Sequence, residues 1–296
     1  LMYKKGFELP HFCDFQLLDD VKGREALRQY YREFALIARQ HDTGYVFCSL
    51  TYRASREWGE LIGFSPEGLA EMNHKSIAFY RQIASEAGLD PGSTLYSGCI
   101  GPRGDAYQLN PTITAASSED YHSEQIETFS KAGVDLVTAL TLNSTEEAIG
   151  IARAARAAGV PSVISFKPDK NRMVGGTHTL RAAIEAVDAA TDGAPAYYMI
   201  NCSHPIDFGP ALDQRDWVGR IRGLRANASS LDHGVLCQLD HLEEGDAVEL
   251  AAQHRELARL YPHFNVYGGC CGTDHVHVGK ICEAVQLVTA SRLEKS

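Results

Sequence analysis

The chain has 296 residues, of which 44% are hydrophobic and 22% charged, and its formal net charge is -10. This balance supplies one large core and leaves no basic cluster for a phosphate backbone, which excludes the common nucleic-acid-binding classes. No apolar stretch reaches the roughly 20 residues that a membrane-spanning helix needs. We therefore expect a single domain over residues 1–296. The strongest positive run, from Arg215 to Arg225, is expected to be a solvated junction between a helix and a strand.

Short apolar segments alternate with longer helical patterns along most of the chain. Nearly continuous apolar runs are typical of parallel strands that are buried on both faces. Strands are expected at Tyr45–Leu50, Thr94–Ile100, Leu136–Leu142, Ser162–Phe166, Ala196–Cys202, Ile221–Ala226 and Asn265–Tyr267. Helices are expected at Gly23–Gln40, Pro66–Ala87, Glu119–Ala132, Thr145–Ala158, Thr177–Ala190, Asp246–Leu260 and Asp274–Ala290.

This alternation predicts an α/β fold, a (β/α)8 TIM barrel. Seven strands are expected where a closed barrel has eight, and the helix Gly23–Gln40 comes before the first of them. The first strand of the barrel is therefore expected before Leu1. An open doubly wound sheet is the competing fold, but the sequence shows no Gly-rich dinucleotide loop that would support it.

The chain has eight cysteines, yet its length and core need no disulfide staples, and no secretory signal is visible. A reducing cytoplasm therefore fits better than an oxidising compartment. Five of the cysteines are expected to be structural, namely Cys13, Cys48, Cys99, Cys237 and Cys282.

The other three cysteines stand at the ends of two expected strands. Cys202 closes one strand in the segment YYMINCSHP, and Cys270 and Cys271 close the last strand in NVYGGCCGTDH. Because the chemistry of α/β barrels lies at the carboxyl ends of the strands, the three thiols are expected to meet there. Glycines let the backbone turn tightly at this point, and they are Gly268, Gly269 and Gly272.

Three sulfur ligands with an open fourth position are typical of a catalytic zinc ion, whereas a structural zinc has four protein ligands. Cys202, Cys270 and Cys271 are therefore candidate ligands for Zn²⁺. The alternatives are three buried apolar cysteines or a redox pair. Spacing alone leaves these alternatives open, and the position at the strand ends favours the metal site.

The strings MINCSHP and GGCCGT resemble the two zinc-ligand motifs of the homocysteine S-methyltransferase family. The resemblance extends over nearly the whole chain, through LTYRAS, CIGPRGD and YHSEQIETFSKAGVDLV, each at the family's place relative to a strand. It implies a barrel fold, and it implies zinc bound by Cys202, Cys270 and Cys271.

The sequence departs from the family pattern in two places. Family members usually start with an Asp-Gly-Gly strand, which here would fall before Leu1, so an active-site Asp is not located. They also usually have a Glu-Thr pair at the end of the fourth strand, whose Glu contacts the amino group of homocysteine. Here Leu140 precedes Thr141 at that place. Either the amino acid is recognised differently or the acceptor is not homocysteine.

These features predict a zinc-dependent S-methyltransferase that moves a methyl group from a sulfonium or betaine-type donor to a thiol. Coordination to zinc deprotonates the thiol, and the thiolate is the nucleophile. Homocysteine is the default acceptor and gives methionine. The alternatives are a different thiol or selenol acceptor, or a non-catalytic barrel with a structural zinc. The expected partners are small molecules, with no nucleic acid and no membrane.

Three residues are candidate substrate contacts. The amide of Asn201 is placed to orient the substrate, a role that the family resemblance favours. Tyr52 offers an aromatic face to a cationic donor, and Trp58 and Phe166 are further aromatic candidates, each more often a core or rim residue. Thr273 begins the last helix, where backbone N–H groups can hold a carboxylate.

Other polar residues have simpler explanations. Asp274 is expected to cap the last helix, and Asp105 to satisfy the backbone of a turn. His204 is interpreted as an ordinary loop histidine. His275 and His277 alternate near a helix start, so both are expected at the surface.

Overall fold

The computed structural model describes residues 2–108, 110–213, 215–236 and 238–293. The chain forms two compact units. The first comprises Leu1–Ile164 and Ala186–Ala196, and the second comprises Ser165–Glu185 and Tyr197–Ser296. Cys237, which we expected to be structural, lies outside the described residues. The single domain expected over residues 1–296 stays a prediction.

The first unit is built on parallel strands in chain order. β1 (Tyr45–Cys48) pairs with β2 (Thr94–Ile100), and β2 pairs with β3 (Leu136–Leu142), both in parallel register. β4 (Ser162–Phe166) is next in the sheet order, and its last two residues belong to the second unit. All seven residues of β3 and all five of β4 are buried, as expected of strands covered on both faces.

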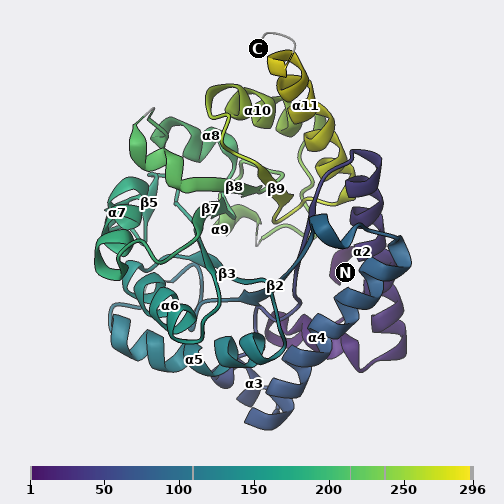
Figure 1. The fold of residues 1–296 in the computed structure, drawn as a ribbon, viewed down its shortest axis with the longest axis vertical. Helices are drawn as coiled ribbons and strands as arrows, with labels where there is room; N and C mark the ends of the chain where they lie inside the picture. The colour runs from purple at the N-terminus through teal and green to yellow at the C-terminus, as the bar shows by residue number, and fades with distance from the viewer. Residues whose placement is uncertain (1, 109, 214, 237, 294–296) are drawn as a thin grey trace. The chain divides into compact units, whose positions relative to one another are not determined.

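Helices alternate with these strands and pack beside them. α5 lies along α6, and α4 contacts both α5 and β2 (Figure 1). The helices of this unit are α1 (Met2–Lys5), α2 (Val21–Gln40), α3 (Arg56–Glu60), α4 (Pro66–Ala87), α5 (Ala115–Lys131) and α6 (Thr145–Ala157). Short 3-10 turns span Pro10–Phe12, Asp14–Leu18 and Pro91–Ser93.

The second unit repeats the same arrangement. β7 (Tyr197–Asn201) pairs with β8 (Ile221–Ala226), and β8 pairs with β9 (Val266–Gly269), again in parallel. α10 (Ala247–Leu260) packs against α11 (His275–Leu293), and α11 contacts β9 (Figure 1). The remaining helices are α7 (Leu180–Thr191), α8 (Pro205–Phe208) and α9 (His233–Leu236). The division between the two units falls within α7, after Glu185. Short 3-10 turns span Gly209–Ala211 and Asp216–Arg220.

The expected α/β alternation is confirmed, and the described residues contain seven strands in the parallel arrangement. The closed barrel of eight strands that we expected stays a prediction. Most expected boundaries agree to within one or two residues. The helix expected from Glu119 begins earlier, at Ala115, because Thr114 and Ser117 form a capping box.

One expected helix start is wrong. Residues 177–179 were expected to open a helix, but α7 begins at Leu180. A two-stranded antiparallel hairpin occupies the preceding segment, with β5 (Met173–Val174) paired to β6 (His178–Thr179). Gly175 and Gly176 both have positive φ, at 58° and 68°, which a hairpin loop needs and a helix does not accept.

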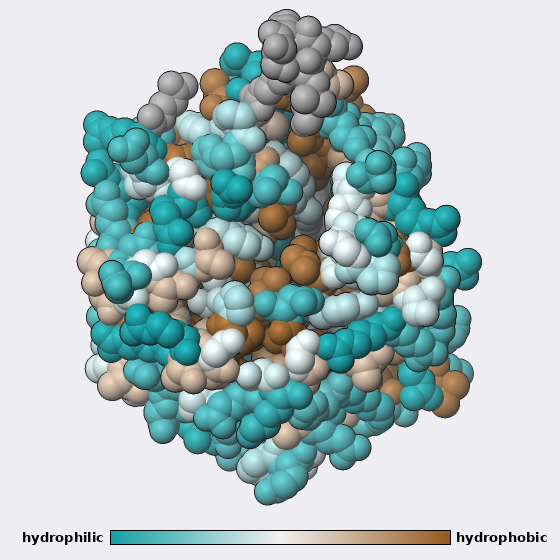
Figure 2. Space-filling view, in the orientation of Figure 1, coloured by the Kyte–Doolittle hydropathy of each residue, from teal (hydrophilic) through white to brown (hydrophobic). Residues whose placement is uncertain are grey.

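No helix among the described residues is long and apolar enough to cross a lipid bilayer. Hydrophilic residues cover most of the face drawn in Figure 2.

His254 on α10 makes the stability of the protein pH-dependent. Its ring is fully buried, Nδ1 donates to the Leu250 carbonyl at 2.8 Å, and Nε2 has no partner among the described residues. Burial lowers the pKa of His254 from 6.5 to about 4. The unfolded chain therefore takes up this proton first, and stability is lost as the pH falls from 6.5 towards 4.

Between pH 7 and pH 5 we expect His254 to account for about 2 kcal/mol of lost unfolding free energy. Urea unfolding at the two pH values measures this loss, and His254→Leu serves as the comparison. The variant should lose correspondingly less stability over the same interval. An equal loss in both proteins would contradict the assignment.

Candidate functional site

Three cysteine side chains of the second unit meet beyond the carboxyl ends of β7 and β9. The sulfur atoms of Cys202, Cys270 and Cys271 all lie within 4.8 Å of one another, and those of Cys202 and Cys271 are 3.8 Å apart. None of the described cysteines forms a disulfide. A tetrahedral zinc ion with Zn–S bonds of about 2.3 Å places its sulfur ligands about 3.8 Å apart. The expected meeting of the three thiols is therefore present, with spacings suited to a metal ion.

The end of β8 holds the last two cysteines in place, because β8 lies between β7 and β9. The Cys270 N–H donates to the carbonyl of Ala226 at 2.9 Å, and the Cys271 N–H donates to Oδ1 of Asn227 at 3.2 Å. The Cys271 carbonyl accepts from the N–H of Ala228 at 2.9 Å. These bonds fix the backbone of both cysteines against the neighbouring strand.

Cys202 is held from the other side of β8 and adopts an uncommon backbone conformation. Its N–H donates to the carbonyl of Arg225 at 3.2 Å, and its φ is 53°. A side chain other than glycine rarely adopts a left-handed conformation, which is found more often at functional sites. This turn ends β7 at Asn201, one residue earlier than expected, and directs the Cys202 side chain towards the other two.

Glycines shape the turn that follows β9. A Cβ on Gly269 would stand 2.0 Å from Oγ1 of Thr273, and Gly272 has a φ of 78°. The Thr273 hydroxyl donates to the Cys270 carbonyl at 2.7 Å and so closes the turn. Thr273 therefore has a structural role, and its substrate contact stays a prediction.

Asn201 directs its amide at the cluster. Its Nδ2 lies 3.9 Å from the sulfur of Cys270, and its Oδ1 accepts from the Ser165 hydroxyl at 2.6 Å. Both polar side chains are buried, with exposed fractions of 1% and 0%. Ser165 thus fixes the orientation in which Asn201 can donate to a thiolate. The expected substrate contact of Asn201 stays a prediction.

Replacing Asn201 with leucine is expected to lower zinc affinity by about 10- to 100-fold, the usual cost of losing a group that orients a metal ligand. Ser165→Ala, which removes only the orienting hydroxyl, should give a smaller loss. Competition with a chromophoric chelator measures both affinities. Unchanged affinity in Asn201→Leu would show that its amide does not support Cys270.

Cys270 and Cys271 differ in how readily their thiols ionise. Hydrogen bonds from the thiols of Cys202 and Cys271 hold the pKa of Cys270 well below its usual range, and the positive charge of Arg225 acts in the same direction. The pKa of Cys271 is raised well above its usual range by its interactions with Cys202 and Cys270. A cation bound among the three sulfurs would favour their thiolate forms. This donor set fits a divalent metal ion.

Two histidines near the cluster are buried. His204 caps α8, since its Nδ1 accepts from the N–H of Ile206 at 3.4 Å, and burial lowers its pKa. The expected surface position of His277 is wrong, because its ring is only 5% exposed. Its Nε2 lies 2.8 Å from the Glu244 carbonyl, and its Nδ1 lies 2.9 Å from Oδ1 of Asp274.

The expected simple roles of two acidic residues are confirmed. Oδ1 of Asp274 accepts from the N–H of Val276 at 3.0 Å at the start of α11. Oδ1 of Asp105 accepts from the N–H of Tyr107 at 2.7 Å within a turn.

Arg225 is a residue that the sequence interpretation missed. The run that contains it was expected to be a solvated junction, but Arg225 is half-buried on β8 and its Nε donates to the Gly269 carbonyl at 3.3 Å. Its surroundings are set by the register of β8 with its neighbouring strands, which pairs Arg225 with Asn201 and Gly268, and no signal in the adjacent residues indicates this.

The remaining candidates are Tyr52, Trp58 and Leu140 in the first unit and Phe166 in the second. Tyr52 follows β1, where the Arg53 guanidinium lies 5.0 Å from its ring centre. The same guanidinium lies 3.7 Å from the ring centre of Trp58. Phe166 is fully buried and therefore a core residue. Leu140 is buried in β3 and is followed by Thr141 with a φ of 62°. The substrate contact of Tyr52 stays a prediction.

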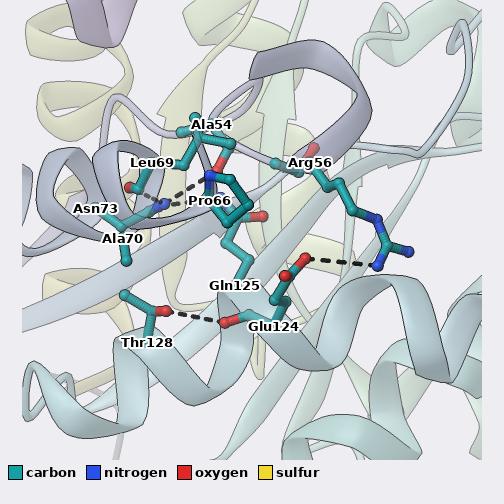
Figure 3. Close-up of a pocket in the computed structure, with 10 residues that line it drawn as sticks. Ala54, Arg56, Pro66, Leu69, Ala70, Asn73, Glu124, Gln125 and Thr128 are labelled. Atoms are coloured by element: carbon teal, nitrogen blue, oxygen red, sulfur yellow. Dashed lines mark hydrogen bonds and ion pairs between the residues drawn. The ribbon is translucent and has the colours of Figure 1, made fainter. Parts of the chain in front are cut away.

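A cavity of about 60 Å³ lies between α4 and α5 in the first unit (Figure 3). Asn73 and Gln125 line it and are hydrogen-bonded to each other at 3.1 Å, and Arg56 pairs with Glu124 at its edge. Ligand pockets usually enclose about 300 Å³ or more. The cavity is therefore too small for an amino acid or a methyl donor.

Fold and cluster together define the protein as a parallel α/β protein with a three-thiol centre at the ends of its strands. The family model for homocysteine S-methyltransferase matches residues 9–285. The chain therefore belongs to the homocysteine S-methyltransferase family, and it is a methyltransferase.

Solved structures support the fold assignment. The homocysteine methyltransferase MmuM from Escherichia coli in its oxidized form is 20% identical, with a TM-score of 0.70 over 90% of this chain and 86% of that one. The metallated form of MmuM is 16% identical, with a TM-score of 0.69 over 91% and 87% of the two chains. These likenesses show a shared fold. No curated protein matches the sequence significantly.

Proposed function

We propose that this protein is a zinc-dependent S-methyltransferase that moves a methyl group from a sulfonium or betaine-type donor to a thiol. The observation that supports this most directly is the cluster of Cys202, Cys270 and Cys271, whose sulfurs lie within 4.8 Å of one another. Membership of the homocysteine S-methyltransferase family makes homocysteine the default acceptor, with methionine as the product.

The three cysteines are the residues that would hold the zinc ion. Zinc in such a site supplies an open position that favours the thiolate form of an added thiol at neutral pH. A zinc with only a structural role would have four protein ligands, and the described residues around the cluster offer three.

The protein itself positions the reacting groups. Backbone bonds to the end of β8 hold the cysteines, and the amide of Asn201 supports the sulfur of Cys270. The acceptor sulfur then attacks the methyl carbon in line, so that a new S–C bond forms as the bond from carbon to the donor breaks. The donor leaves with the bonding electron pair, as a neutral thioether if it is a sulfonium ion. No general base is needed once the acceptor is a thiolate.

The proposal also covers the substrate contacts, the identity of the acceptor and the cellular compartment. We assign Asn201, Tyr52 and Thr273 to substrate contacts. Leu140 stands where the family resemblance expects a carboxylate for the acceptor's amino group, so a different thiol or a selenol is the second candidate acceptor. Three reduced cysteines suit a reducing compartment, which we take to be the cytoplasm.

The test is a panel of acceptors and donors with zinc-loaded protein. S-methylmethionine, S-adenosylmethionine, betaine and dimethylsulfoniopropionate are each incubated with homocysteine and with other small thiols, and the methylated products are quantified by mass spectrometry. We expect methionine with at least one donor, and none with the Cys202→Ser variant. No methylation of homocysteine or of any other thiol by any donor would contradict the proposal.

A further inference from the structure

Lys170 joins three segments of the second unit, which follow β4, β7 and β8. Its Nζ donates to Oδ1 and Oδ2 of Asp207 on α8, at 3.0 and 2.8 Å, and also to the carbonyl of Ser230. The turn that carries Lys170 is closed by two bonds. Oδ1 of Asp169 accepts from the N–H of Met173 at 2.9 Å, and the Asp169 N–H donates to the Met173 carbonyl at 2.9 Å. A lysine held in this way limits how far the three segments can separate.

Two of the segments that Lys170 joins also hold the cysteine cluster. Asp207 lies on the short segment that continues from Cys202 into α8. Ser230 lies on the segment that continues from Ala228, whose N–H donates to the carbonyl of Cys271 at 2.9 Å. The sulfurs of Cys202 and Cys271 are 3.8 Å apart. This distance therefore depends on how closely the two segments are held together.

Cys202 needs this support because its backbone is strained. Its φ of 53° is left-handed, and a residue other than glycine keeps such a conformation only where its surroundings enforce it. On one side the carbonyl of Ser203 accepts from the N–H of Asn227 at 3.2 Å. Further along, the mostly buried carboxylate of Asp207 is held by Lys170. If this tether is lost, Cys202 can relax, and its sulfur then moves relative to the other two.

We infer that Lys170 is a positioning residue for the metal centre, which holds Cys202 at the distance from the other two cysteines that a zinc ion requires. This inference rests on the proposed zinc-dependent function and adds a residue that shapes its metal site. Lys170 touches neither the metal ion nor the substrates and acts through Asp207 and Ser230. Because an ion pair that is partly exposed contributes little to stability, loss of Lys170 should change the geometry of the cluster more than the stability of the fold.

Titration of the metal-free protein with Co²⁺ tests this role, because the visible absorption of bound Co²⁺ reports the number and arrangement of its thiolate ligands. Lys170→Met, which keeps the length of the side chain, should raise the Kd for Co²⁺ by about 10-fold and weaken the absorption of a tetrahedral site. This is the lower end of the loss for groups that orient metal ligands. Lys170→Arg should restore the Kd to within about 3-fold of the wild type, because a guanidinium can still donate to the Asp207 carboxylate.

Further variants separate the tether from a general effect of charge. Asp207→Asn should give a loss similar to that of Lys170→Met, and the double variant should lose no more than either alone, because both changes remove the same tether. Lys280→Met is the matched control, since Lys280 is 45% exposed against 40% for Lys170, and it pairs with Glu283 within α11. The control should bind Co²⁺ as the wild type does. The metal-free proteins should unfold within about 4 °C of one another.

The outcomes distinguish this inference from the proposed function. A wild-type Kd in Lys170→Met, a loss that Lys170→Arg does not reduce, or additive losses in the double variant would overturn only the role of Lys170. A much lower unfolding temperature of metal-free Lys170→Met would make the residue a support of the fold and would also overturn this role. A wild-type protein that binds Co²⁺ and responds to Lys170→Met, but methylates no thiol when loaded with zinc, would overturn only the proposed function. A wild-type protein that binds no metal would overturn both.

Discussion

Replacing Cys270 with serine is expected to lower zinc affinity by more than about 100-fold and to abolish methyl transfer. Loss of a group that only orients a metal ligand lowers metal affinity by about 10- to 100-fold. Loss of the ligand itself should lower the affinity by more than that. The pKa of the Cys270 thiol is lowered by hydrogen bonds from the other two thiols, and Nδ2 of Asn201 lies 3.9 Å from its sulfur. Serine keeps the size of the side chain but not the soft, easily ionised sulfur.

Zinc content after dialysis, measured by mass spectrometry of the metal, checks this expectation. Cys282→Ser is the matched control, because Cys282 is also half-buried and lies on α11 outside the cluster. The control should keep its zinc and its activity. A Cys270→Ser protein with its full complement of zinc would remove Cys270 from the ligand set.

Replacing Gly272 with alanine is expected to destabilise the protein by about 2–5 kcal/mol and to disturb the cluster at the same time. The φ of Gly272 is 78°, and an added Cβ would stand 2.3 Å from the backbone carbonyl oxygen of Glu243. Backbone cannot move aside as the end of a flexible side chain does. The strain therefore reaches Cys271, which is bonded directly to this glycine.

Urea unfolding of the zinc-free and zinc-loaded proteins measures both effects. Gly209→Ala is the control, since an added Cβ there would meet nothing within 4 Å. The control should unfold within about 1 kcal/mol of the wild type. Wild-type stability in Gly272→Ala would mean that the turn after β9 tolerates a side chain, contrary to its observed backbone conformation.

Local patterns in the sequence predicted most of the repeating structure. The run LVTALTL is apolar enough to be read as a buried strand, and β3 has the expected bounds of Leu136–Leu142. Ser65, Pro66 and Gly88 mark the ends of α4, which also has the expected bounds. Such signals act within a few residues, so they are visible without knowledge of the tertiary structure.

The candidate site was predictable only in part. The three cysteines follow strands, so their meeting followed from the parallel arrangement. His277 and Arg225 were misjudged, because their surroundings come from distant segments. His277 is covered by the loop at Glu244, and Arg225 depends on the register that places it beside Gly268. Residues close in the sequence indicate neither the contact of His277 nor the register of Arg225. Periodicity alone therefore predicts that both side chains are exposed.

X-ray absorption at the zinc edge of the reconstituted protein identifies the atoms that bind the metal ion. We expect one zinc per chain with three sulfur neighbours at about 2.3 Å and one lighter neighbour. Adding an acceptor thiol should replace the lighter neighbour with a fourth sulfur. Fewer than three sulfurs, or four before any thiol is added, would contradict a cysteine site that is open to the acceptor.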